Sequence, residues 1–201
     1  HHGAAKTGIQ QGPSPGIIKM FLFYDLIFLV FAIITIPAYL ARRKFHRGFS
    51  ARLGRLPGNL ALNNPIWIHA VSVGEAIAVK GLLEDLRKEF PAKKFVISTV
   101  TPTGNRIAKT LAQEGDFVTY LPLDLSFIVR RVISRIKPSL FIIAETEIWP
   151  NLISCLYKRK IPVIFVNCRI SDKSFRSYRL IKFLIRGILN KASLFCSQSP
   201  G

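Results

Sequence analysis

Three glutamates stand at positions where a carboxylate could act on a substrate. Glu75 comes directly after Gly74 at the end of an apolar run, and Glu145 and Glu147 follow the apolar run 140–144. A carboxylate in a cleft can remove a proton from an attacking hydroxyl group, and a second carboxylate can orient the substrate or tune the first. The structural alternatives are a favourable first-turn residue for Glu75 and a capping or ion-paired role for the other two. At i and i+2 of an extended chain, Glu145 and Glu147 should project the same way.

Other small or polar residues follow neighbouring apolar runs, and we predict that they bind substrate. These positions are Ser72, Gly74, Thr101, Thr103, Gly104, Glu147, Asn167, Arg169 and Ser171. The string 101–104 offers hydroxyl groups and free amides at the start of a helix, which is a weak signal for an anion site. No cluster of His, Asp or Glu has the spacing of metal ligands, so we predict no metal ion and no cofactor.

Short β-rich runs alternate with longer amphipathic runs from residue 65 onward. The predicted strands cover 66–72, 95–100, 117–121, 140–144, 163–167 and 194–197, and the predicted helices cover 75–89, 103–113, 125–136, 149–159 and 174–190. This alternation is typical of βαβ units, so the predicted fold class is α/β, with a Rossmann-like doubly wound parallel sheet. Ligands bind at the carboxyl ends of the strands in such a sheet, and the candidate residues would share that edge.

The N-terminal part contains a segment long and apolar enough to span a membrane. Residues 20–40 form a run of 21 residues with a single charge, Asp25. A helix needs about 20 apolar residues to cross a bilayer. Basic residues follow the run, beginning with Arg42 and Arg43, and no acid occurs before Glu75. Because a positive flank stays on the cytoplasmic side, we predict one transmembrane helix within residues 17–41 and a cytoplasmic domain after it. A buried core helix and a helix in the membrane interface are the alternatives.

These observations divide the chain into four parts. Residues 1–16 are interpreted as a tag or linker remnant, 17–41 as the membrane anchor, 42–64 as a basic juxtamembrane segment and 65–201 as the Rossmann-like domain. The sequence stops at a strand-like stretch that no closing helix follows. We therefore expect the native protein to be longer than this chain.

The composition predicts anionic partners. The chain has 201 residues, with 29 Lys and Arg against 11 Asp and Glu, which gives a formal charge of +18. Basic and apolar residues interleave over 174–190, and we predict contacts to an anionic phospholipid membrane from Arg176, Arg179, Lys182 and Arg186. Nucleic acid is the less favoured partner, because exposed aromatic side chains for base stacking are not evident. Three cysteines cannot all pair, so no disulfide scaffold is expected.

Five strings taken together resemble the 3-deoxy-D-manno-octulosonic acid (Kdo) transferase family. They are Ser72-Val73-Gly74-Glu75, Thr101-Pro102-Thr103-Gly104, Tyr120-Leu121-Pro122-Leu123-Asp124, Glu145-Thr146-Glu147-Ile148-Trp149-Pro150-Asn151-Leu152 and Asn167-Cys168-Arg169-Ile170-Ser171. The strings stand in the family's order and spacing across roughly residues 45–199. The first and fourth strings in combination are highly specific, although each alone would be weak. Cys168 stands where the family commonly has Ala.

The resemblance implies an inverting glycosyltransferase with two Rossmann-like domains that face each other across a cleft. Such an enzyme transfers Kdo from CMP-Kdo to a lipid A precursor in lipopolysaccharide assembly, at the cytoplasmic face of the inner membrane. This chain would supply the anchor and the acceptor-binding domain. The C-terminal domain that binds CMP-Kdo would be absent, so this chain alone would be inactive. Glu75 matches the family's general base, and Glu145 matches a carboxylate that assists the transition state.

Two other classes of function remain open from the residues alone. The first is a non-catalytic, membrane-tethered module that binds phosphorylated lipid through its basic surface. The second is a nucleic-acid-binding Rossmann domain. A second α/β half in the complete reading frame would favour the enzyme over both.

Overall fold

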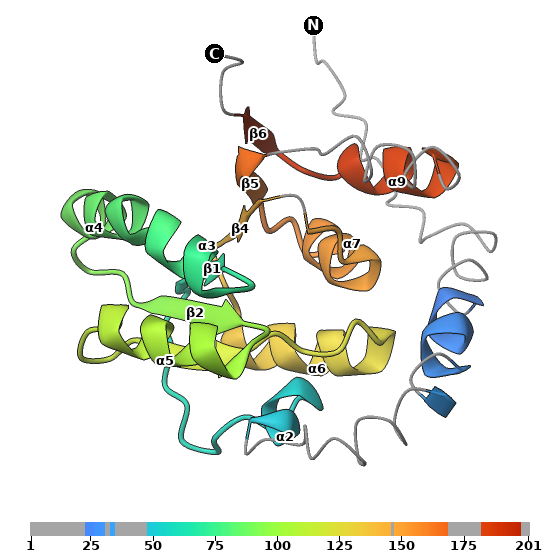
Figure 1. The fold of residues 1–201 in the computed structure, drawn as a ribbon, viewed down its shortest axis with the longest axis horizontal. Helices are drawn as coiled ribbons and strands as arrows, with labels where there is room; N and C mark the ends of the chain where they lie inside the picture. Colours follow the sequence, from blue (N-terminus) through green and yellow to red (C-terminus); the bar gives the residue numbers. More distant parts are fainter. Residues whose placement is uncertain (1–22, 31–32, 35–47, 146, 169–181, 198–201) are drawn as a thin grey trace, which may run out of the picture.

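A six-stranded parallel sheet forms the centre of the protein. The computed structural model describes residues 23–30, 33–34, 48–145, 147–168 and 182–197. The strands are β1 (Ile66–His69), β2 (Phe95–Thr99), β3 (Phe117–Tyr120), β4 (Leu140–Ala144), β5 (Val163–Cys168) and β6 (Leu194–Ser197). Their order across the sheet is β3-β2-β1-β4-β5-β6, and every neighbouring pair is parallel (Figure 1). The predicted parallel α/β sheet is confirmed.

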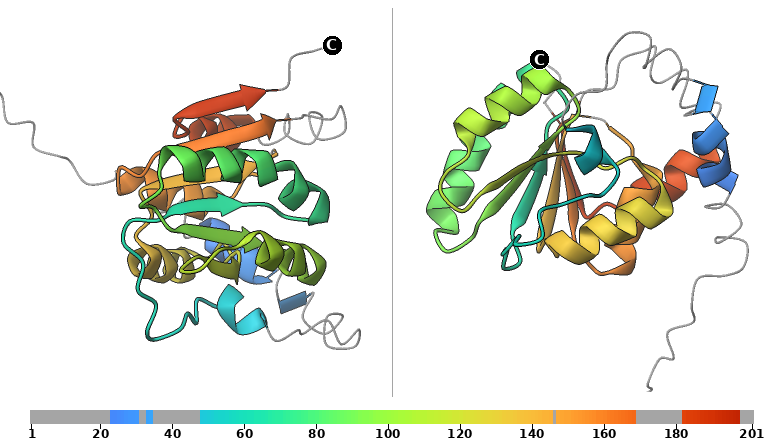
Figure 2. Two further views of the ribbon diagram at one scale, coloured as in Figure 1. Left: turned by 90° about the vertical axis from the view of Figure 1, so that its left-hand side faces the viewer. Right: turned by 90° about the horizontal axis from the view of Figure 1, so that it is seen from below.

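Helices cover both faces of the sheet, as the doubly wound prediction requires. One face carries α3 (Val73–Ala78), α4 (Lys80–Glu89) and α5 (Pro102–Leu111), and the opposite face carries α6 (Ser126–Ile136), α7 (Pro150–Lys158) and α9 (Lys182–Leu189) (Figure 2). The short helix α2 (Phe49–Arg52) contacts β3. Because both faces are covered, strand residues of either parity are apolar and buried.

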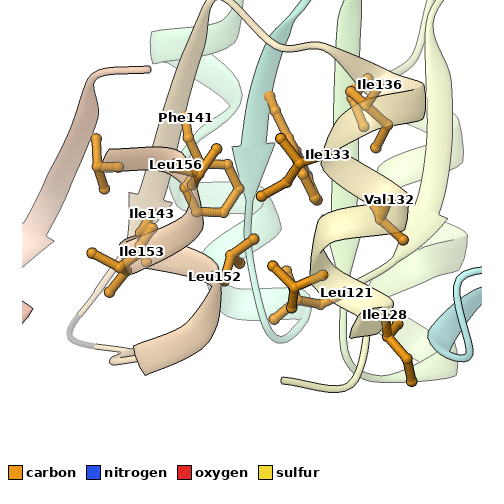
Figure 3. Close-up of a cluster of buried hydrophobic side chains, with 14 of the residues drawn as sticks. Leu121, Ile128, Val132, Ile133, Ile136, Phe141, Ile143, Leu152, Ile153 and Leu156 are labelled. Carbon is orange, nitrogen blue, oxygen red and sulfur yellow. The ribbon is translucent and has the colours of Figure 1, made fainter. Parts of the chain in front are cut away.

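Each face of the sheet has its own hydrophobic core. Trp67 and Phe141 belong to the cluster beneath α6 and α7, and their rings meet edge to face with centroids 4.8 Å apart. Figure 3 shows Phe141 beside Leu156 of α7, with Ile133 of α6 across the cluster. The opposite cluster holds Ile68 and the residues of α3, α4 and α5 that pack on it. The sheet is therefore fixed from both sides, and its carboxyl edge has a defined shape.

The structure corrects two details of the predicted helices. The helix predicted over 75–89 is interrupted at Val79, where a ψ of 0° separates α3 from α4. Helix α2 lies in the segment 42–64, for which no helix was predicted. The helix predicted over 174–190 is described only from Lys182 to Leu189, so its first part lies outside the described residues.

The predicted membrane anchor lies mostly outside the described residues. Within 17–41, only 23–30 and 33–34 are described, and both pieces are helical. Asp25 in this segment accepts hydrogen bonds from the Ser126 main-chain N–H, at 3.1 Å, and from Asn151 Nδ2, at 2.7 Å. The single charge of the apolar run thus ties helix 23–30 to the first turns of α6 and α7. Among the described residues, no helix has both the length and the apolar character needed to cross a bilayer.

Asp124 holds the start of α7 against the loop that follows β3. Its carboxylate accepts the main-chain N–H groups of Asn151, at 3.0 Å, and Leu152, at 2.8 Å. Trp149, at the N-cap position of α7, makes no side-chain capping bond, so Asp124 supplies the cap from a distant segment. Burial raises the pKa of Asp124 to about 6, although the two amides oppose the shift.

Replacing Asp124 by Ala should destabilise the fold by about 1–3 kcal/mol, because two buried amides of α7 lose their acceptor. Chemical denaturation followed by circular dichroism measures this change. The matched control is Glu114→Ala, which removes an exposed carboxylate. Equal stability of the two variants would show that Asp124 does not hold α7.

Candidate functional site

The candidate site lies between β1 and β4, where the order of the strands along the sheet reverses. The helices after β1 cover one face of the sheet and the helix after β4 covers the other, although β1 and β4 are neighbouring strands. The helices therefore diverge above the carboxyl ends of these two strands, which is where doubly wound sheets bind ligands. Glu75 follows β1, and Glu145 and Glu147 follow β4. The three glutamates thus meet at this switch point.

Glu75 occupies the first turn of α3 and its carboxylate folds back over the start of that helix. One carboxylate oxygen accepts the main-chain N–H of Val71, and the other accepts the Ser72 hydroxyl at 3.2 Å. Ser72 is the N-cap residue of α3, so the string 72–75 forms a variant of the capping box. The first-turn role considered from the sequence is therefore real. It also holds the carboxylate in one orientation with only 9% of the residue exposed.

The three glutamates influence one another electrostatically. Burial raises the pKa of Glu75 above its ordinary value, the Val71 amide opposes this, and the negative charge of Glu145 adds to it. Burial also raises the pKa of Glu147, and the charge of Glu75 contributes next. Among the described residues, no Lys or Arg forms an ion pair with any of the three. Unpaired carboxylates gathered at a ligand-binding edge of so basic a chain are typical of a functional site.

The backbone at Glu145 differs from the prediction. An extended chain was expected to carry Glu145 and Glu147 on one side, but Glu145 has a φ of 64°. Its N–H still donates to the Val166 carbonyl at 2.9 Å, so Glu145 keeps its hydrogen bond to β5 while its backbone leaves the extended conformation. The prediction of an extended pair is therefore wrong at Glu145. A non-glycine residue held in this region stores about 1 kcal/mol or more of strain.

Thr101 and Gly104 have structural roles at the same edge. Thr101 is the N-cap residue of α5, and its Oγ1 accepts the Gly104 N–H at 3.0 Å. A Cβ at Gly104 would lie 3.2 Å from the Ser72 carbonyl carbon, so only glycine lets α5 approach the start of α3 this closely. Thr103 is exposed, and its hydroxyl lies 3.3 Å from that of Thr101. Thr101 and Gly104 therefore fix the start of α5 beside the start of α3.

Gly74 and Asn167 affect the shape of the carboxyl edge in different ways. A Cβ at Gly74 would meet nothing within 4 Å, so packing does not require glycine and open space lies in front of α3. Asn167 has a φ of 56° and sits at a register irregularity between β5 and β6. Asn tolerates this conformation better than most residues, and bulges of this kind are frequent beside active sites.

The structure brings only some of the predicted site residues together. Those at the described edge follow four neighbouring strands: Ser72, Gly74, Glu75, Thr101, Thr103, Gly104, Glu145, Glu147 and Asn167. Outside the described residues lie Arg169, Ser171, Arg176 and Arg179. The backbone of Lys182 begins α9, and Arg186 is exposed in the last turn of that helix. Helix α9 leads into β6, so its last turn, which carries Arg186, lies toward the amino end of that strand.

His69 is a core residue. Its Nδ1 lies 3.0 Å from both the carbonyl oxygen and the Oγ of Ser98, which also accepts from Trp67 Nε1 at 2.8 Å. Burial lowers the pKa of His69 to about 4, so the ring is neutral at pH 7. No group of His, Cys, Asp or Glu in the described part of the chain could hold a metal ion.

Sequence reasoning missed the residues that hold the glutamates in place. The Val71 amide and the Val166 carbonyl act through the main chain, which no residue type reveals. Ser72 was expected to bind substrate, and the capping-box spacing of Ser72 and Glu75 was the available signal for its second role.

Comparison with known proteins gives one family. Residues 47–201 match the model of a family described as 3-deoxy-D-manno-octulosonic-acid transferase (kdotransferase). The 3-deoxy-D-manno-octulosonic acid transferase of Haemophilus influenzae is 40% identical over 143 residues, which cover 70% of this chain and 34% of that protein. The transferase of the same name from Chlamydia pneumoniae is 27% identical over 190 residues, covering 91% of this chain and 44% of that protein. This chain therefore spans less than half the length of either relative.

Among solved structures, Acinetobacter baumannii MurG has a similar chain path. The superposition has a TM-score of 0.49 with 11% sequence identity and covers 69% of this chain and 42% of MurG.

Replacing Glu145 by Gln should lower the pKa of the Glu75 carboxyl, because the repelling charge of Glu145 is removed while the Val71 and Ser72 hydrogen bonds remain. Titration of ¹³C-labelled glutamate side chains by NMR measures this pKa, and Glu75→Gln assigns the signal. Glu114→Gln, which removes an exposed charge, serves as the control. An unchanged Glu75 pKa in Glu145→Gln would contradict the electrostatic coupling at the switch point.

Proposed function

The chain belongs to the 3-deoxy-D-manno-octulosonic acid (Kdo) transferase family, and on this premise we propose that it forms the acceptor-side part of an inverting glycosyltransferase. The complete protein would transfer Kdo from CMP-Kdo to a lipid A precursor in lipopolysaccharide biosynthesis. The observation that carries the proposal is the group of three glutamates at the switch point, without a cationic partner among the described residues. In this proposal a second domain of the complete protein binds CMP-Kdo.

Glu75 is the proposed general base. An inverting transfer needs one group to take the proton from the acceptor hydroxyl as that oxygen attacks the sugar. The hydrogen bonds from Val71 and Ser72 hold the Glu75 carboxylate at the edge, and the open space in front of Gly74 leaves room for an acceptor. A raised pKa suits a base, since the carboxylate then binds the proton more strongly than an ordinary glutamate does.

Glu145 is the proposed partner of this base. Its charge raises the pKa of Glu75, and its left-handed backbone stands directly after the end of β4. A carboxylate there can also stabilise positive charge that develops on the sugar ring during transfer. Glu147 and the residues at the ends of β2 and β5 are proposed to position the acceptor.

Membrane association is part of the proposal. In helix 23–30 and at 33–34, the side chains of Phe23, Leu26, Ile27, Leu29, Val30, Ile33 and Ile34 are between 46% and 70% exposed. A contiguous set of exposed large apolar side chains fits a lipid environment better than water. We place the protein at the inner membrane, with its basic surface against anionic phospholipid and the α/β domain on the cytoplasmic side.

Glu75→Gln in the complete protein should reduce transfer about 10²- to 10⁴-fold, because glutamine cannot accept the proton. Release of CMP from CMP-Kdo in the presence of lipid A precursor measures turnover, and circular dichroism confirms the fold. Glu89→Gln, at the exposed end of α4, is the matched control. Near-normal turnover of a folded Glu75→Gln variant would exclude Glu75 as the base.

The pH dependence of transfer follows from the raised pKa of Glu75. Activity should increase with pH as Glu75 loses its proton, with a midpoint above the ordinary value for glutamate. In Glu145→Gln the remaining activity should show that midpoint at lower pH, since the repulsion is gone. A midpoint that is unchanged or that moves to higher pH would contradict the assigned roles.

Replacing Leu26, Ile27 and Val30 by Ser should shift the chain from the membrane pellet to the supernatant at high salt. The reason is that their exposed apolar surface no longer favours lipid, while the Asp25 contacts to the domain are untouched. Sedimentation after carbonate or high-salt washing measures the distribution. Exposed polar substitutions on α4, such as Glu84→Ser, provide the control. An unchanged pellet fraction would show that helix 23–30 does not contact the membrane.

A further inference from the structure

A groove runs along the outer side of the edge strand β3, away from the three glutamates. Its volume is about 580 Å³. Helix α2 and the residues after it form one wall, and one face of α5 forms the other. The α5 residues that line it are Pro102, Asn105, Arg106 and Lys109, at the spacing i, i+3, i+4 and i+7 of a single helical face.

The charges that line the groove are all positive. Arg55, Arg106 and Lys109 line it, and no Asp or Glu does. All three side chains are exposed at the groove, and none forms an ion pair within the described part of the chain. Their attraction for an anion is therefore not already satisfied by a carboxylate. Apolar side chains, among them Leu56 and Phe117, line the same groove. Such a mixture suits an anionic group attached to an apolar body.

Specific contacts fix the walls of the groove. Asn105 Nδ2 donates to the Thr119 carbonyl at 3.2 Å, which ties α5 to β3 on the groove floor. The Leu123 N–H donates to the Arg52 carbonyl at 2.8 Å, which ties α2 to the segment after β3. A Cβ at Gly48 would lie 1.8 Å from the Tyr120 ring, so the start of α2 is in direct contact with that ring. The groove is therefore a built feature of the fold and not a gap between mobile surface side chains.

The groove and the glutamates are separate but within reach of one ligand. Strand β3 lies two strands from β1, which is about 10 Å across the sheet. Pro102 lines the groove and directly follows Thr101, at the edge that carries Glu75. An extended amphiphile could place an anionic group in the groove while another of its groups lies near Glu75.

We propose that this groove binds the phosphomonoester headgroup of a lipid. The inference rests on the proposed function for the choice of a lipid ligand, and on the groove itself for the anion. A phosphomonoester carries a charge between −1.5 and −2 at pH 7 and three acceptor oxygens, which match the three cationic side chains. The apolar lining contacts the part of the lipid next to the phosphate.

The test uses the full 201-residue chain in neutral detergent micelles. Its affinity is measured by thermophoresis at fixed salt for dioctanoyl phosphatidic acid, for hexose 6-phosphate and for a short RNA. Arg106→Gln and Lys109→Gln should each weaken phosphatidic acid binding about fivefold, which corresponds to about 1 kcal/mol. Arg131→Gln, an equal change of charge on the exposed face of α6, should change it less than twofold.

A second variant separates the groove from diffuse surface charge. Ala51→Phe fills the groove without changing charge, and it should weaken phosphatidic acid binding at least as much as Arg106→Gln. Circular dichroism and thermal unfolding verify that each variant is folded. If Ala51→Phe is folded and binds normally, or if Arg131→Gln has the effect of Arg106→Gln, the groove site is overturned.

The other probes decide the class of ligand. Hexose 6-phosphate that binds as tightly as phosphatidic acid, with the same dependence on Arg106, would overturn the lipid assignment in favour of a soluble phosphate. RNA that binds more tightly through the same residues would overturn it in favour of nucleic acid. Glu75 lies outside the groove, so Glu75→Gln should leave phosphatidic acid binding unchanged, and its turnover is measured in the complete protein. Near-normal turnover would overturn the proposed base alone, whereas phosphatidic acid binding that does not depend on Arg106 would overturn the groove site alone.

Discussion

The divergence of helices above β1 and β4 is the constraint on which the rest of the site depends. Two neighbouring parallel strands send their following helices to opposite faces, and no helix can then cover the carboxyl ends between them. The chain uses that uncovered edge to gather the glutamates. Main-chain groups of neighbouring strands hold them there: the Val71 amide binds Glu75, and the Val166 carbonyl accepts from Glu145. The acidic edge is a product of strand order more than of local sequence.

Three aspartates elsewhere in the fold hold its elements together. Asp124 and Asp25 bind main-chain or side-chain N–H groups at the starts of α6 and α7, and these contacts satisfy donors that would otherwise be unpaired. Asp116 binds Arg87 and the Phe95 amide. These carboxylates are neutralised or capped by their partners. The acids at the switch point are glutamates, and among the described residues none of them has a cationic partner of the kind that Asp116 has in Arg87.

The sequence predicted the features that depend on local patterns and missed those that depend on tertiary contacts. Apolar strands buried on both faces, such as 140–144, are visible as continuous apolar runs, and their places agree closely with β4 and its neighbours. The interruption at Val79 and the left-handed Glu145 depend on tertiary contacts, and no local pattern marks them. The capping of α7 by Asp124 was not predicted, because an acceptor 27 or 28 residues from its donors leaves no local pattern. Nothing in the sequence indicated the cationic groove, because Arg55 and Arg106 are distant in sequence and line one groove only through the contacts of α2 and α5 with β3.

The left-handed backbone of Glu145 carries a cost in stability at the acidic edge. Glycine would adopt the φ of 64° at no steric cost, so a chain selected only for resistance to unfolding would replace this glutamate. Asn167, also left-handed, is the kind of residue that such selection tolerates. A carboxylate at position 145 therefore costs some stability at the end of β4, and its charge raises the pKa of Glu75. Lys137 and Lys160 are also left-handed, so glycine substitution for heat resistance is open at several positions, but at Glu145 it would remove a carboxylate from the acidic edge.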